Sequence, residues 1–191
     1  FPTRRSSDLQ QVANKSESIF FAPSLAGTDF IAYFCRKQQK TQYMSTGLFA
    51  GSFDPFTIGH DSIVRRALPL FDKLVIGVGL NDKKKYTTTT DERVKAIQDV
   101  YANEPKVEVV AFSDCTMDLA KRVGAGFIVK GVRNVRDFEF ERDQAEINRL
   151  VGNIETILLY SEPELACVSS SAVRELRAFG KNVDKFLPKS K

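Results

Sequence analysis

GLFAGSFDPFTIGHDSIV (residues 47–64) is the stretch of sequence that decides the fold. An apolar strand over 46–51 runs into a Gly/Ser/Pro loop and then into a predicted helix over 60–71, which begins at His60, the only histidine of the chain. For an isolated loop of this kind, a structural turn capped by the histidine is the simpler interpretation. The alternative is a phosphate site, since glycine permits close backbone approach and a helix N-terminus attracts anions. The stretch matches neither G-x-x-x-x-G-K-[ST] nor G-x-G-x-x-G.

The rest of the chain alternates strand and helix patterns. Further strands are predicted over 73–80, 106–112, 126–132 and 154–160, and further helices over 91–102, 116–125, 134–150 and 169–180. The near-continuous apolar run of the second strand is typical of a strand buried on both faces of a parallel sheet. Five strands separated by helices, without an internal repeat, predict an α/β fold with a doubly wound five-stranded parallel sheet. Such sheets bind ligands at the carboxyl ends of their strands.

Cations and hydroxyl groups gather in the loops that follow these strands. Lys84 lies in a run of three lysines, Lys130 and Arg133 stand on either side of a glycine, and three serines at 169–171 begin a helix, with Arg174 one turn further on. Each feature has a plain explanation by itself: a solvated loop, a helix cap, or surface charge. The carboxylates of the helix over 134–150 are likewise explained by the helix dipole. All these loops share one sheet edge, and that favours phosphate binding.

Several other functions are disfavoured. One histidine and three widely spaced cysteines do not form a familiar zinc site or a catalytic triad, so covalent catalysis is not expected. A net charge of +4 suits an anionic small molecule, and the basic residues lack the interleaved aromatics of a nucleic-acid surface. The apolar segment over 18–35 is too short and interrupted to span a membrane. The class of function that these exclusions leave is phosphoryl or nucleotidyl transfer, in which the protein positions the substrates and neutralises their charge.

The first forty-three residues differ from the rest of the chain. They begin without methionine, and residues 1–18 have no periodicity. We expect residues 1–43 to be poorly ordered and foreign to the native protein, with Met44 as its start. A single domain over 44–191 then carries the function.

Four stretches resemble, in order and spacing, the bacterial phosphopantetheine adenylyltransferase family of the HIGH-type nucleotidyltransferase superfamily. They are GSFDPFTIGH, KKKYTTTTDERV, VKGVRNVRDFEFE and CVSSSAVREL, within a match over about 47–188. The resemblance implies a Rossmann-like nucleotidyltransferase fold and reversible transfer of the adenylyl group from ATP to 4′-phosphopantetheine. The products are dephospho-coenzyme A and pyrophosphate, with Mg²⁺ carried by the ATP phosphates and no protein metal site. It further implies a homo-oligomer, a hexamer in this family, and we expect it in the cytoplasm.

The resemblance also implies residue roles. The catalytic positions are His60, Lys84 and Arg133. The ATP-binding positions are Ser52, Phe53, His60, Gly131, Val132, Arg133, Glu141, Leu165, Ala166, Cys167, Val168, Ser169, Ser170 and Ser171. The phosphopantetheine-binding positions are Ser52, Lys84, Thr116 and Lys130. Lys130 stands where the family usually has arginine, which keeps the charge but loses bidentate phosphate recognition.

Two alternatives stay open from the sequence. One is another HIGH-type transferase, such as a nicotinamide-mononucleotide adenylyltransferase or a cytidylyltransferase, although the DFEFE helix and the short C-terminal region argue against it. The other is a non-catalytic nucleotide-binding protein on the same fold.

Overall fold

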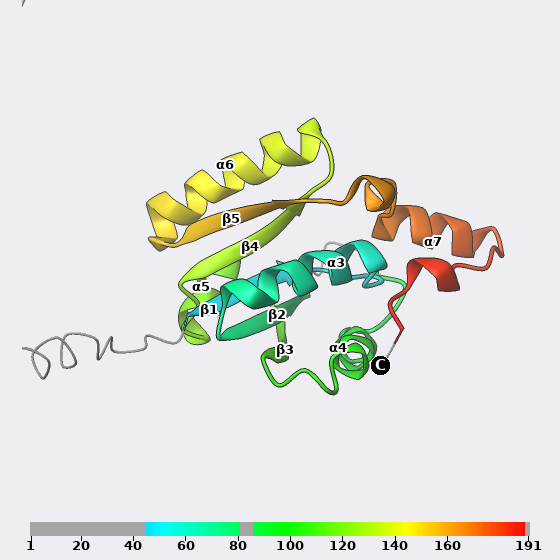
Figure 1. Cartoon of the computed structure of the whole chain (residues 1–191), viewed down its shortest axis with the longest axis horizontal. Coiled ribbons are helices and arrows are strands. Elements are labelled where there is room, and N and C mark those ends of the chain that lie inside the picture. Colours follow the sequence, from blue (N-terminus) through cyan, green and yellow to red (C-terminus); the bar gives the residue numbers. More distant parts are fainter. Residues whose placement is uncertain (1–44, 81–85, 190–191) are drawn as a thin grey trace, which may run out of the picture. The chain divides into compact units, whose positions relative to one another are not determined.

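All five predicted strands form, and they pair in parallel in one sheet (Figure 1). The computed structural model describes residues 45–80 and 86–189. The strands are β1 (Thr46–Gly51), β2 (Lys73–Gly79), β3 (Val107–Phe112), β4 (Phe127–Val132) and β5 (Glu155–Tyr160). Their order in the sheet is β3-β2-β1-β4-β5, with every pair parallel. The predicted doubly wound five-stranded parallel sheet is confirmed.

The helices lie where the apolar periodicity predicted them. They are α3 (Ile58–Ala67), α4 (Thr90–Val100), α5 (Thr116–Arg122), α6 (Val135–Gly152) and α7 (Ser170–Ala178), with 3-10 turns η2 (Leu68–Leu70), η3 (Pro163–Leu165) and η4 (Asp184–Phe186). The first helix begins at Ile58 rather than at His60, and it gives way to a 3-10 turn around Pro69. A capping box between Thr89 and Glu92 begins α4.

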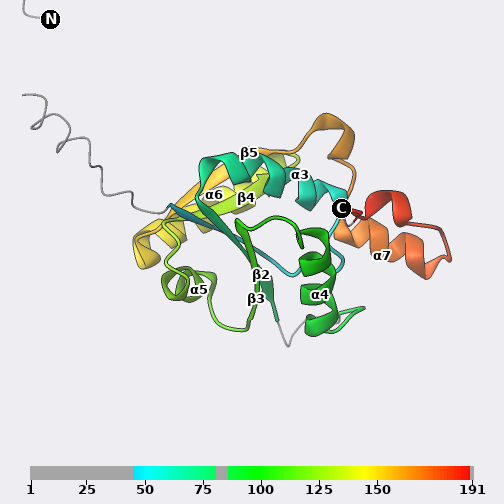
Figure 2. The ribbon, with the colours of Figure 1, turned by 60° about the horizontal axis from the view of Figure 1, so that its bottom comes forward.

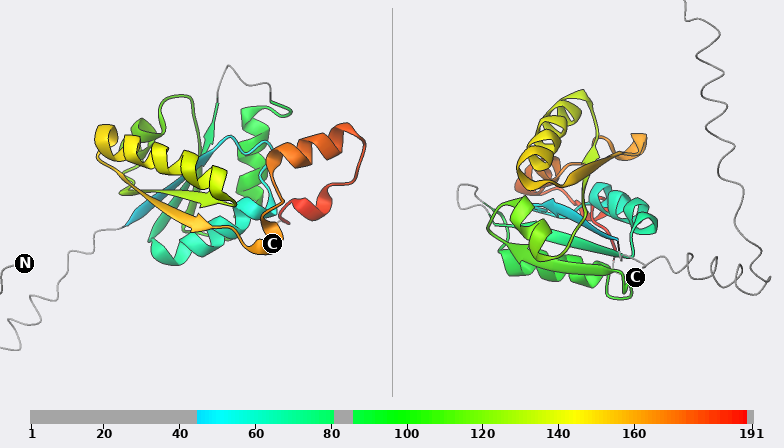
Figure 3. Two further views of the ribbon diagram at one scale, coloured as in Figure 1. Left: turned by 90° about the horizontal axis from the view of Figure 1, so that it is seen from above. Right: turned by 90° about the vertical axis from the view of Figure 1, so that its left-hand side faces the viewer.

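Alternate side chains of the strands face opposite layers of helices. Phe49, Ile76 and Val129 pack with residues of α3 and α4 in one cluster. Their neighbours in the strands, such as Leu48 and Val75, pack with residues of α5 in a second cluster. Helix α6 contacts β4 and β5, and the further views show helices on both faces of the sheet (Figure 3). The crossovers therefore diverge between β1 and β4, which is where a doubly wound sheet opens a crevice.

Gly131 allows α3 to lie close to the carboxyl end of β4. A Cβ atom at this position would lie 2.9 Å from Cγ1 of Ile63 in α3, closer than real Cβ contacts come. The N-terminus of α3 and the end of β4 therefore flank the same crevice.

Some expectations concern residues outside the described ranges. The prediction that residues 1–43 are poorly ordered and the role given to Lys84 both lie there. Within 45–80 and 86–189, every helix is too short or too polar to span a bilayer.

Candidate active site

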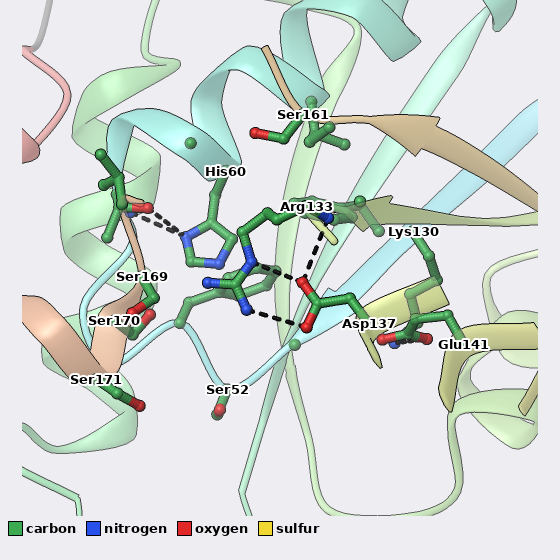
Figure 4. A pocket seen from close by; sticks show the side chains of 18 of the residues that line it. Ser52, His60, Lys130, Arg133, Asp137, Glu141, Ser161, Ser169, Ser170 and Ser171 are labelled. Atoms are coloured by element: carbon green, nitrogen blue, oxygen red, sulfur yellow. Dashed lines mark hydrogen bonds and ion pairs between the residues drawn. The ribbon is translucent and has the colours of Figure 1, made fainter. Parts of the chain in front are cut away.

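A cavity of about 320 Å³ opens at the carboxyl ends of β1 and β4 (Figure 4). Its walls come from the end of β1, the start of α3, the end of β4, the first turns of α6 and the start of α7. Eleven of the residues named from the sequence line it: Ser52, Phe53, His60, Lys130, Gly131, Arg133, Glu141, Val168, Ser169, Ser170 and Ser171. The phosphate-seeking groups of three separate loops, which follow β1, β4 and β5, are thus brought to one place.

Other named residues lie outside the cavity wall. Val132 is buried in the core at the end of β4. Thr116 is the first residue of α5, which follows the edge strand β3. The run over 165–167 precedes the serines of α7 without lining the cavity. Arg174 donates to the carbonyl oxygen of Asp54 and to Oγ of Ser171, and it does not line the cavity beside the serines.

His60 caps α3, as the structural interpretation of the opening stretch predicted, and it also lines the cavity, which leaves the phosphate interpretation a prediction. Its Nδ1 accepts a hydrogen bond of 3.0 Å from the backbone N–H of Thr57. Since a backbone N–H is always the donor, the ring hydrogen of the neutral imidazole resides on Nε2. Nε2 is directed toward the space between Arg133 and the serines of α7 (Figure 4).

The surroundings keep this imidazole uncharged. The ring packs against Phe53 and Phe56, with centroid distances of 5.1 and 5.4 Å. This burial, together with the positive charge of Arg133, lowers the pKa of His60 to about 4. At neutral pH the residue is therefore a neutral hydrogen-bond donor toward the cavity.

Asp137 holds the Arg133 guanidinium at the cavity wall. Nε of Arg133 donates to Oδ2 of Asp137 at 2.8 Å, and Nη2 donates to Oδ1 at 3.3 Å. The backbone N–H of Asp137 is bound in turn by the side chain of Asn134, the N-cap of α6. Sequence reasoning assigned Asp137 to the helix dipole and missed this pair. The spacing of the two residues could have indicated the ion pair, because Arg133 and Asp137 are four residues apart across a strand–helix junction.

Lys130 and Glu141 form a second ion pair in the cavity wall. Nζ of Lys130 lies 3.3 Å from Oε2 of Glu141, and both side chains are mostly buried. Within the described ranges, this buried Oε2 has no hydrogen-bond partner. The ion pair with Lys130 is therefore the interaction that offsets the burial of this carboxylate oxygen.

The loop after β1 is tied to a distant threonine run, which the sequence did not indicate. The buried Asp54 carboxylate accepts hydrogen bonds from N–H of Thr87 (2.9 Å), Oγ1 of Thr87 (2.6 Å) and Oγ1 of Thr88 (3.0 Å). Burial by itself raises the pKa of Asp54, but these bonds and the charge of Arg174 outweigh it, so the pKa falls below its usual value. The loop after β1, which contributes Ser52, Phe53 and Thr57 to the cavity wall, is therefore held in place by the protein itself.

These groups can bind a polyphosphate and stabilise negative charge on it. Two cations, a neutral imidazole donor, serine hydroxyls and the N-termini of α3 and α7 converge on one cavity. The two carboxylates in the wall are each paired with a cation. This donor set suits transfer of a charged group between oxygens.

Comparisons with known proteins point the same way. A family model described as cytidylyltransferase-like matches residues 48–176. The chain is 51% identical over 145 residues to the phosphopantetheine adenylyltransferase of Phocaeicola vulgatus, covering 76% of this chain and 96% of that protein. It is 46% identical to the same enzyme of Leuconostoc citreum, with 76% and 93% covered.

Solved structures show the fold. A bifunctional NMN adenylyltransferase/ADP ribose pyrophosphatase from Francisella tularensis matches with a TM-score of 0.60 at 15% identity, covering 78% of this chain and 46% of that one. A nicotinate-nucleotide adenylyltransferase structure from Vibrio parahaemolyticus matches with a TM-score of 0.54 at 18% identity, covering 76% and 94%.

Proposed function

The chain belongs to the phosphopantetheine adenylyltransferases, and from this premise we propose how its own residues perform the reaction. The enzyme transfers the adenylyl group of ATP reversibly to 4′-phosphopantetheine, giving dephospho-coenzyme A and pyrophosphate, a step of coenzyme A biosynthesis. One observation above all supports the residue roles. A neutral His60, fixed in its Nε2–H tautomer, lies beside Arg133 at the carboxyl ends of β1 and β4.

In the proposed mechanism a phosphate oxygen of 4′-phosphopantetheine attacks the α-phosphorus of ATP in line. A new P–O bond forms as the bond to the leaving pyrophosphate breaks, with the electron pair departing on pyrophosphate. Because the nucleophile is already an anion, the reaction needs no strong general base. His60 Nε2–H donates to the α-phosphate oxygens as their charge grows, and Arg133 neutralises that charge.

The surrounding hydrogen bonds prepare both groups in advance. The N–H of Thr57 sets the orientation of the His60 ring, and Asp137 sets that of the Arg133 guanidinium. Preorganised donors of this kind cost no reorganisation during the reaction. Lys130 would bind the phosphate of 4′-phosphopantetheine. The ammonium group of Lys130 would then interact with both that phosphate and the carboxylate of Glu141.

The residue roles taken from the resemblance remain part of this proposal. Lys84 would join His60 and Arg133 in charge stabilisation and would bind phosphopantetheine together with Thr116. The run over 165–171 would hold ATP, and three of its serines contribute to the cavity wall.

Magnesium is proposed to enter on the ATP phosphates. Within the described ranges, no group of three or more His, Cys, Asp or Glu side chains is arranged to hold a metal ion. The two cavity carboxylates, Asp137 and Glu141, are engaged by Arg133 and Lys130. The donor set thus does not fit a metal held by the protein, and Mg²⁺ would serve by neutralising phosphate charge on the nucleotide.

We also propose a cytoplasmic homo-oligomer, a hexamer by family resemblance. Helix α6 supports an assembly, because Phe140, Leu150 and Val151 on it are each more than 60% exposed. Sedimentation velocity would give the mass in solution.

A panel of acceptors and nucleotides tests the function. Pyrophosphate release is measured with ATP or CTP and with 4′-phosphopantetheine, nicotinamide mononucleotide or no acceptor. We expect release only with ATP and 4′-phosphopantetheine. Release with nicotinamide mononucleotide, or preference for CTP, would replace the proposed substrate, and ATP binding without release under any condition would favour the non-catalytic alternative.

A further inference from the structure

Three side chains from two helices donate hydrogen bonds to backbone carbonyls of the loop after β1. Arg93 of α4 donates from Nη1 to the carbonyl oxygen of Ser52. From α7, Arg174 donates to the carbonyl of Asp54 at 2.5 Å and Ser170 to that of Pro55 at 2.8 Å. Helices α4 and α7 lie close to this loop from different sides of it (Figure 2).

Arg93 is an unusual member of this set because it is only 3% exposed. Its Nη1 also donates to the carbonyl of Gly79 at 3.1 Å, so a single guanidinium joins the ends of β1 and β2. Nη2 donates to Oγ1 of Thr90 at 3.0 Å, and the guanidinium lies 4.2 Å from the centre of the Tyr86 ring. Among the described residues, no carboxylate forms an ion pair with it. Burying such a charge is costly, and the hydrogen bonds to neutral groups offset that cost.

The bond from Arg93 sets the direction of the peptide between Ser52 and Phe53. In a trans peptide the C=O and the N–H point in opposite directions. Because the Ser52 carbonyl faces Arg93, the N–H of Phe53 faces away from it. Ser52 and Phe53 both line the cavity, whereas Arg93 does not. Within the described ranges this N–H has no hydrogen-bond acceptor.

The backbone of Phe53 requires such support. Its φ is +47°, in the left-handed region, which an aromatic residue seldom adopts. Backbone of this kind persists only where the surroundings fix it, and it is concentrated at ligand sites.

We propose that Arg93 is a positioning residue for adenylyl transfer: by binding the Ser52 and Gly79 carbonyls, it turns the Phe53 N–H toward the ATP phosphates. It acts through the backbone and touches no substrate. The inference rests on the proposed function and adds to it a residue outside the cavity.

The test compares three variants of the full-length protein. Arg93→Met removes the donors, Arg93→Lys keeps the charge without the guanidinium's paired donors, and Lys95→Met removes a cation from the exposed face of the same helix. Pyrophosphate is the probe, titrated by NMR into protein labelled with ¹⁵N-phenylalanine, and steady-state kinetics are measured alongside.

In the wild type we expect the Phe53 amide to shift on pyrophosphate binding. Arg93→Met should lose that shift and bind pyrophosphate about 10- to 100-fold more weakly, as for loss of one hydrogen bond to a charged group. Arg93→Lys should recover part of the affinity, and Lys95→Met should behave like wild type. A merely structural role would lower the folded fraction but leave the pyrophosphate affinity of the folded protein unchanged.

Unchanged pyrophosphate affinity and an unchanged Phe53 shift in folded Arg93→Met would overturn the inference. So would full recovery in Arg93→Lys, which would assign the effect to charge alone. If Arg93→Met does not fold, Arg93→Lys decides: weaker binding supports the proposal and wild-type binding contradicts it. Failure of the proposed function has a separate signature, namely wild-type protein that releases no pyrophosphate from ATP and 4′-phosphopantetheine.

Discussion

The protonation state of His60 gives the sharpest physical prediction. When the pH is lowered from 8 to 4, this ring should become protonated at a much lower pH than an ordinary histidine does. The cause is burial against Phe53 and Phe56, with a further contribution from the positive charge of Arg133. Because His60 is the only histidine of the chain, untagged protein gives a single imidazole signal.

The size of the effect follows from the lowered pKa. A fall from 6.5 to about 4 corresponds to roughly 3 kcal/mol of preference for the neutral ring in the folded state. The unfolded chain binds a proton below pH 6.5, whereas the folded protein resists it until about pH 4. The contribution to folding stability is therefore complete above pH 6.5 and is lost as the pH falls toward 4.

Two measurements test this. NMR titration of the imidazole should give a pKa near 4 and, at neutral pH, a hydrogen on Nε2. Urea unfolding at successive pH values should show stability falling between pH 6.5 and 4 by up to about 3 kcal/mol, and this fall should be absent in a His60→Asn variant. Asp54, whose pKa is lowered, contributes a separate loss at more acidic pH.

A measured pKa of 6 or higher, or a hydrogen on Nδ1, would refute the reasoning. Either result would mean that the ring is solvated or that the Thr57 N–H does not bind Nδ1. The proposed donor role would then lose its basis.

Three further changes have defined outcomes. Asp137→Asn should lower kcat about tenfold or more by releasing Arg133, whereas Asp143→Asn, on the exposed face of α6, should not; equal rates would contradict the positioning role. Gly131→Ala should destabilise the protein by about 1–3 kcal/mol in urea unfolding, since its Cβ would overpack against α3; unchanged stability would argue against the close contact. Asp54→Asn should cost about 1–3 kcal/mol, because a buried carboxylate loses its role as acceptor, and the stability loss at acidic pH assigned to it should disappear; persistence of that loss would assign it elsewhere.

The sheet was predictable because its signals are local. The apolar run of β2 reflects burial on both faces, and the Thr89–Glu92 capping box marks the start of α4. Gly180, with φ of +66°, follows the C-cap of α7, where a glycine commonly stops a helix. The alternation of strands and helices predicted a parallel sheet whose strand-end loops share one edge, whereas the strand order β3-β2-β1-β4-β5 came from the structure alone.

The contacts that support the cavity were not predictable. Asp54 binds a threonine 33 residues away, and Arg93 binds a carbonyl 41 residues away. Such pairs depend on how the helices and loops are placed around the sheet. The local pattern of apolar and polar residues in the sequence does not predict that placement. Resemblance likewise transferred positions such as Thr116 that do not line the cavity.

The role of His60 as a charge-stabilising donor is the central claim, and the turnover of a His60→Ala variant tests it most directly. Formation of dephospho-coenzyme A is measured at saturating ATP and 4′-phosphopantetheine, with folding and ATP binding checked on the same sample. We predict a kcat about 10²- to 10³-fold below wild type, as for loss of one preorganised donor. A folded variant that binds ATP and turns over within a few fold of wild type would contradict the account.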